Sequence, residues 1–105
     1  MLTSRFAVCF ILALAATTRA TEVGPGAELK RNQPLAVAAL IDRIISCNHW
    51  SGESPYDADR AKQINAAFSE LRCSQLKDDE AAILSKYQAD AAVKRAISAA
   101  HEIYL

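Results

Sequence analysis

The side chains best suited to chemistry lie between positions 47 and 73, and they are Cys47, His49, Glu53, Asp57, Asp59 and Cys73. Two thiols, an imidazole and a carboxylate are the ligand types of a zinc site. The spacing matches no zinc motif, because Cys-x-His is short and neither Cys-x-x-Cys nor His-x-x-x-His occurs. An imidazole beside carboxylates also suits acid–base catalysis, yet the chain has no nucleophile elbow, phosphate-binding loop or His-Glu-x-x-His motif. We therefore expect no metal, no cofactor and no enzymatic activity.

The first twenty residues predict a secretory signal peptide, which bears on the state of the cysteines. Arg5 precedes the apolar run 6–16, and Ala20 offers a small residue for cleavage. This run is too short to cross a bilayer, and no later segment is long and apolar enough to do so. Of the three cysteines, Cys9 lies within the apolar run of the predicted signal peptide, so the mature chain keeps two. Export leads to an oxidising compartment, where an even number of cysteines in a small chain favours a disulfide. We therefore predict a periplasmic or secreted protein with a Cys47–Cys73 disulfide, which would leave no thiolate for zinc.

Length and charge limit the remaining organisation. We expect a signal peptide at 1–20, a flexible lead-in at 21–33 and one helical domain at 34–105; a cut within 13–16 is the alternative, since Arg19 is unusual near a cleavage site. A domain this small has a modest core, so a crosslink would contribute much of its stability. The twelve basic and twelve acidic residues form no basic stripe, and nucleic acid is not an expected partner.

Apolar periodicity predicts an all-α fold of three helices around one core. The first helix begins at Pro34 and buries Val37, Leu40, Ile41, Ile44 and Ile45, with Asp42, Arg43 and Ser46 on the opposite side. The second runs from Pro55 to Cys73, capped by Ser54 in a capping-box pattern with Asp57, and buries Ala61, Ile64, Phe68 and Leu71.

The third helix begins near Asp78 and carries two apolar faces that do not align. One face consists of Ile83, Leu84, Tyr87 and Ala91, and the other of Val93, Ile97, Ala100 and Tyr104. Asp90 and Lys94 lie where the faces would join. Either the helix bends there, or its two halves pack on different neighbours.

A disulfide at the far end of the second helix would constrain the connection before it. A helix over 55–73 is about 27 Å long, and the disulfide requires the two Cα atoms to lie within about 7 Å. Eight residue steps from Cys47 to Pro55 reach at most about 29 Å. We therefore expect Asn48 to Ser54 to form a nearly extended strap along the second helix.

This segment also holds the candidate binding residues, which are His49, Trp50, Glu53 and Tyr56. Aromatic side chains that stay exposed commonly form the centre of a recognition surface. The competing interpretation is a structural lock, in which Trp50 lies in the core and Glu53 pairs with Arg60.

The stretch from Cys47 to Cys73 resembles a segment of uncharacterised short exported proteins of proteobacteria. The shared pattern is Cys-x-His-Trp/Phe-x-Gly-Glu, then Tyr-Asp-Ala-x-Arg, then a second cysteine. The matching residues are Cys47, His49, Trp50, Gly52, Glu53, Tyr56, Asp57, Ala58, Arg60 and Cys73. The resemblance implies export and a cysteine-paired helical hairpin, and it implies no activity.

Together these observations predict a small exported helical protein that binds a protein or small ligand without catalysis. The alternative function is a metal-binding or enzymatic module that uses His49 and Glu53.

Overall fold

The structure is a computed structural model that describes residues 24–104. The predicted signal peptide at 1–20 and the first part of the lead-in lie outside these residues, as does Leu105.

The described part of the chain consists of helices and their connections, and no strand occurs between residues 24 and 104. The elements are α1 (Ala27–Lys30), α2 (Leu35–Ser51), α3 (Ala58–Glu70), a 3₁₀ turn η1 (Cys73–Gln75), α4 (Leu76–Lys86) and α5 (Ala91–Ala100). The predicted all-α class is confirmed, whereas the predicted number of three helices is wrong. One additional helix lies in the lead-in, and the predicted third helix is two helices.

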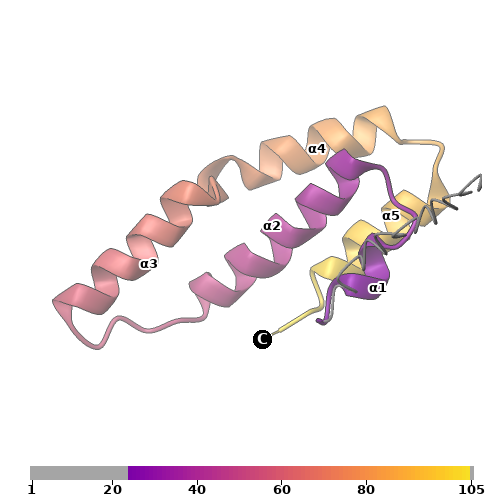
Figure 1. The fold of residues 1–105 in the computed structure, drawn as a ribbon. Coiled ribbons are helices and arrows are strands. Elements are labelled where there is room, and N and C mark those ends of the chain that lie inside the picture. Colours follow the sequence, from indigo (N-terminus) through magenta and orange to yellow (C-terminus); the bar gives the residue numbers. More distant parts are fainter. Residues whose placement is uncertain (1–23, 105) are drawn as a thin grey trace, which may run out of the picture.

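α2 is the central helix, and each of the other α-helices contacts it. α3 and α4 follow one another along one side of α2, and α1 and α5 lie beside its N-terminal half (Figure 1). The predicted apolar face of α2 is buried, as are four residues of α5; these are Val37, Leu40, Ile41, Ile44, Ile45, Val93, Ala96, Ile97 and Ala100. Between residues 24 and 104, no helix is long and apolar enough to span a membrane.

The described part of the predicted lead-in contains the helix α1. α1 places Leu29 against the core, and Lys30 forms an ion pair with Asp42 at 2.9 Å. Gly26 is buried, and a Cβ atom at this position would lie only 2.7 Å from Cδ1 of Ile45. The absence of a side chain at Gly26 therefore lets the chain pass close to α2.

The predicted third helix is interrupted between Lys86 and Ala91. Asp90 caps α5, because its Oδ1 accepts hydrogen bonds from the backbone N–H groups of Ala92 and Val93 at 3.0 and 3.1 Å. A cap of this kind replaces the helical hydrogen bonds that the preceding residues would otherwise supply. The two misaligned faces therefore belong to α4 and α5, which both pack against α2.

The predicted Cys47–Cys73 disulfide is present, with the two Cα atoms 5.8 Å apart. The predicted extended strap over residues 48–54 is absent. α2 continues past Cys47 to Ser51 and ends at Gly52, whose backbone N–H donates to the carbonyls of Asn48 and His49. No extended strap is needed, because α3 is shorter than predicted at both ends. The linker over 52–57 is therefore long enough to join α2 to α3.

The start of α3 also differs from the prediction. Asp57, not Ser54, is the N-cap, and its Oδ1 accepts a hydrogen bond from the backbone N–H of Arg60 at 2.7 Å. Of the predicted apolar stripe only Ile64 is buried, at 7% exposed, while Ala61, Phe68 and Leu71 are half-buried. Since α2 is the main helix beside α3, most of the surface of α3 faces away from other elements.

The disulfide should contribute a large share of the stability. Replacing both cysteines by serine removes the closure of a loop with a sequence separation of 26, and we expect unfolding free energy to fall by about 2–4 kcal/mol. Denaturant unfolding of the oxidised protein and the double variant measures this difference. In the presence of reductant the two proteins should unfold alike, and equal stability under oxidising conditions would count against a stabilising crosslink.

Candidate binding surface at the end of the hairpin

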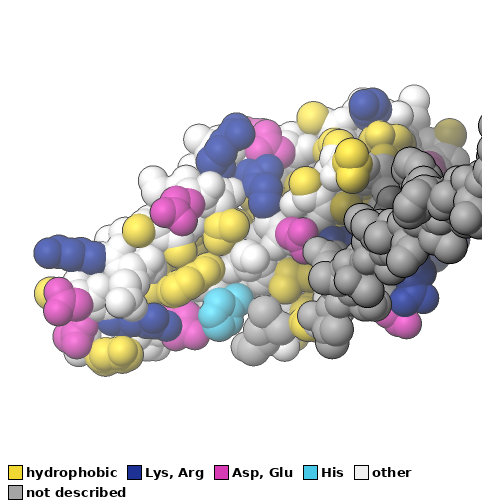
Figure 2. Space-filling view, viewed as in Figure 1, with side chains coloured by type: hydrophobic (Ala, Val, Ile, Leu, Met, Phe, Trp, Pro, Cys, Tyr) yellow, Lys and Arg dark blue, Asp and Glu magenta, His cyan; other side chains and the backbone are white. Residues whose placement is uncertain are grey.

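The end of the α2–α3 hairpin brings together four side chains, which we call the tip cluster: His49, Trp50, Glu53 and Arg60. The last turn of α2 carries His49 and Trp50, the linker carries Glu53, and the first turn of α3 carries Arg60. Figure 2 shows hydrophobic, basic, acidic and histidine side chains gathered on the face at this end of the hairpin. The structure therefore places three of the four predicted binding residues in one cluster.

Glu53 is the central acceptor of the tip cluster. Its Oε2 lies 2.9 Å from Nη2 of Arg60, and its Oε1 lies 3.6 Å from Nε2 of His49. The hydrogen bond from Arg60 lowers the pKa of Glu53 below its usual value, with smaller contributions from the charges of Arg60 and His49. The same pairing raises the pKa of Arg60. The predicted Glu53–Arg60 pair is confirmed.

Trp50 lies between the two basic groups. The guanidinium carbon of Arg60 is 5.2 Å from the centroid of the indole, within the range of a cation–π interaction. The imidazole of His49 meets the indole edge-on, with ring centroids 5.5 Å apart and an interplanar angle of 69°. Trp50 is half-buried, so it is neither a core residue nor a fully exposed one.

Arg60 is held in one orientation by several neighbours. Its Nη1 donates to Oε1 of Gln63 at 2.9 Å, while Nη2 is bound by Glu53. Its Nε is buried without a hydrogen-bond partner. A guanidinium placed this way can exchange partners only by disrupting the contacts of the linker.

Tyr56 is the predicted binding residue that stands apart from the tip cluster. Its side chain is 80% exposed, on the linker just before the Asp57 cap. The linker is anchored by Glu53 at one end and by that cap at the other. The ring is therefore displayed on a segment whose ends are fixed.

The arrangement offers little to a metal ion. Both cysteines are in the disulfide, and among residues 24–104 no three His, Cys, Asp or Glu side chains converge closely enough to hold one. Asp57 is occupied as a helix cap, and Asp59 lies exposed in the first turn of α3. In the tip cluster the contact between His49 and Glu53 thus remains, and the carboxylate of Glu53 is already paired with the guanidinium of Arg60.

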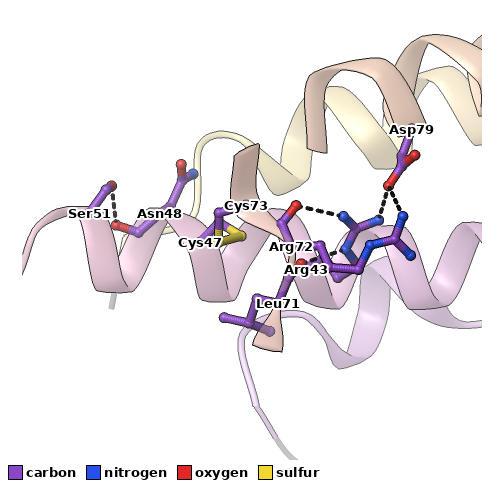
Figure 3. Close-up of a disulfide and its surroundings, with 8 residues drawn as sticks. All are labelled: Arg43, Cys47, Asn48, Ser51, Leu71, Arg72, Cys73 and Asp79. Atoms are coloured by element: carbon purple, nitrogen blue, oxygen red, sulfur yellow. Dashed lines mark hydrogen bonds and ion pairs between the residues drawn. A yellow bond between two sulfur atoms is a disulfide. The ribbon is translucent and has the colours of Figure 1, made fainter. Parts of the chain in front are cut away.

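The residue that sequence reasoning missed is Arg43, whose spacing puts it on the polar side of α2. Its Nε and Nη2 donate to the carbonyls of Leu71 and Arg72 at 2.9 and 3.0 Å, and its Nη1 binds Oδ2 of Asp79 at 2.8 Å (Figure 3). These contacts, which we call the Arg43 clamp, satisfy carbonyls where α3 ends and the chain turns through Arg72 in a left-handed conformation. The spacing of Arg43 could have indicated this role, because Arg43 lies one helical turn before Cys47 and so on the same side of α2 as the disulfide.

A second tie joins the end of α5 to the rest of the molecule. Nε2 of His101 lies 2.7 Å from Oε1 of Glu80 on α4, and Asn48 donates from Nδ2 to the backbone carbonyl of His101 at 3.3 Å. Tyr104, placed by the periodicity on an apolar face, lies beyond α5 and is 82% exposed.

Comparison of the chain with family models, with curated proteins and with solved structures finds no match. The resemblance of the segment between the two cysteines to short exported proteins therefore stays a prediction.

The Arg43 clamp should be sensitive to a change that keeps the charge. Arg43→Lys retains a cation but loses the planar set of donors, so we expect a loss of unfolding free energy of about 1–3 kcal/mol. The matched control is Arg95→Lys on the exposed side of α5, which should change stability by less than about 0.5 kcal/mol. Denaturant unfolding of both variants makes the comparison, and equal effects would contradict the clamp.

The lowered pKa of Glu53 predicts a pH dependence. The Glu53–Arg60 pair stabilises the fold above the ordinary carboxyl pKa of about 4.3, and this contribution is lost as the pH falls through the lower folded pKa. Glu53→Gln should therefore reduce the melting temperature at pH 7 and approach the wild type as the pH falls toward 3. Glu70→Gln, at an exposed position on α3, is the control. A constant difference across the pH range would contradict the assignment.

Proposed function

We propose that this protein is a non-catalytic interaction module, exported to the periplasm or beyond, that recognises a protein or small ligand through the end of its α2–α3 hairpin. The signal-peptide pattern and a disulfide both support an oxidising location. The proposed site consists of His49 and Tyr56, which contact the partner, and of Trp50 and Glu53, which hold the linker in place.

The observation that carries the proposal is the exposure of Tyr56 on an anchored linker. An exposed aromatic ring supplies a large contact area, and tyrosine adds a hydroxyl that can donate or accept a hydrogen bond. Anchoring of the linker by Glu53 and Asp57 reduces the entropy lost when a partner binds. A ring beyond the end of a helix, such as Tyr104 after α5, would not have this advantage.

The tip cluster and Tyr56 have separate tasks in this account. The Glu53–Arg60 pair and the Arg60–Trp50 contact hold the linker, while Tyr56 and the partly exposed side chain of His49 meet the partner. The residues that hold the linker and the residues that contact the partner are therefore different, although both groups lie at the end of the hairpin. Glu53→Ala should lower stability and binding together, whereas His49→Ala should weaken binding with a smaller loss of stability.

Site-specific photo-crosslinking in the producing cell tests the proposal and requires no purified partner. A benzoylphenylalanine residue replaces Tyr56 in one variant and Tyr104 in the control, since both rings are about equally exposed at 80% and 82%. We expect a discrete adduct from position 56 that His49→Ala weakens, and none from position 104. Adducts of equal yield at both positions, or none at position 56, would refute recognition by the hairpin end.

A further inference from the structure

The segment enclosed by the disulfide, residues 48–72, is weakly attached to the rest of the molecule; we call it the disulfide loop. Its helix α3 buries one side chain, Ile64, which is not part of the core cluster built by α2 and α5. Tertiary burial supplies most of the stability of a short helix in water. The attachment of α3 therefore depends on the crosslink, the Arg43 clamp and the tip cluster more than on apolar packing.

The two cysteines of the crosslink differ in exposure. Cys47 is buried in α2 at 6% exposed. Cys73 is half-buried and lines an open groove of about 520 Å³ where α3 meets η1, together with Asn65, Phe68, Ser69 and Ser74. A reagent in this groove therefore lies beside Cys73, whereas Cys47 is not among the lining residues.

The lining of the groove suits an anionic sulfur nucleophile. Apart from the disulfide itself it consists of one amide, one phenyl ring and two hydroxyl groups, so no carboxylate repels an incoming thiolate. The amide and hydroxyl groups can donate hydrogen bonds to polar parts of the reagent.

We propose that Cys73 is the site of thiol–disulfide exchange, with a small thiol or a dithiol as the reaction partner. The thiolate attacks the sulfur of Cys73 and forms a mixed disulfide, while the electron pair of the broken bond leaves with the sulfur of Cys47, which takes up a proton. A second thiolate then attacks the mixed disulfide and releases Cys73 as a thiolate. Two electrons pass from two thiols to the protein, and the thiols leave joined as a disulfide.

Reduction at this site releases the disulfide loop while the remainder of the fold persists. The core residues of α2 and α5 and the partly buried residues of α4 do not involve the crosslink. Opening is therefore local, and it exposes Trp50, Ile64 and Phe68 together. The recognition surface proposed above lies in the same loop, although the exchange reaction does not depend on that function.

Filling the groove tests the point of attack. Ser69→Phe places a bulky ring beside Cys73, and the control Ser85→Phe places the same ring on an exposed position of α4. The oxidised proteins are treated with dithiothreitol, quenched with acid and alkylated, and the two cysteine-containing peptides are quantified by mass spectrometry. We expect Ser69→Phe to slow reduction at least about tenfold and the control to have no effect.

Equal rates in Ser69→Phe, the control and the wild type would overturn the proposal, because the disulfide would then react by a route that avoids the groove. If Ser69→Phe disturbs α3, as judged by circular dichroism, Ser74→Phe fills the same groove from η1 and decides the question by the same measurement.

The consequence of reduction is tested on the wild-type protein by hydrogen exchange before and after treatment with dithiothreitol. Amides of residues 58–70 should exchange at least about tenfold faster in the reduced protein, while those of residues 35–45 and 91–100 change less than about threefold. Fluorescence of Trp50, the only tryptophan in the chain, should shift to longer wavelength in parallel. Acceleration spread over all helices, or none in α3, would overturn local release.

Discussion

The junction at Cys47 and Cys73 is the constraint on which the rest of the hairpin depends. The crosslink brings the end of α3 to within 5.8 Å of α2, measured between the Cα atoms. Arg43, one helical turn earlier, binds the carbonyls at which α3 ends and the carboxylate of Asp79 on α4. One disulfide and one guanidinium thus hold the end of α3 against α2, whereas a buried apolar interface holds α5 against α2. The molecule accordingly has a core at one end and a crosslinked hairpin at the other.

At the far end of the hairpin, electrostatic contacts replace apolar packing in a similar way. Glu53 joins Arg60 to the linker, and Arg60 in turn lies over Trp50. These groups are only half-buried, so their interactions weaken in salt and acid more than buried packing would. A hairpin held by a reducible bond and by charged contacts can be released without loss of the core. The same construction keeps the linker ordered enough to present Tyr56.

Sequence patterns predicted the parts of this structure that follow from helical periodicity and from cysteine chemistry. The apolar residues of α2 from Val37 to Ile45 are buried as their spacing indicated, and the disulfide and the Glu53–Arg60 pair are present. Helix ends were harder to predict. Ser54 and Asp57 are both good caps, and the choice between them depends on which residue the linker brings to the start of α3.

The tertiary contacts of single polar residues could not be predicted from the sequence either. Arg43 lies on the polar side of α2, and only the position of the end of α3 turns it into a clamp. The interruption at Asp90 could be suspected from two misaligned apolar faces, yet a bent helix would show the same pattern. Local propensity cannot decide between these outcomes, because the deciding contacts are made with α2.

Non-reducing peptide mapping tests the central claim most directly. The protein is purified without reductant, alkylated while denatured and digested. The account predicts that the peptides carrying Cys47 and Cys73 are found as one species linked by a disulfide. Recovery of both cysteines in alkylated form, or of either one joined to a different partner, would contradict it.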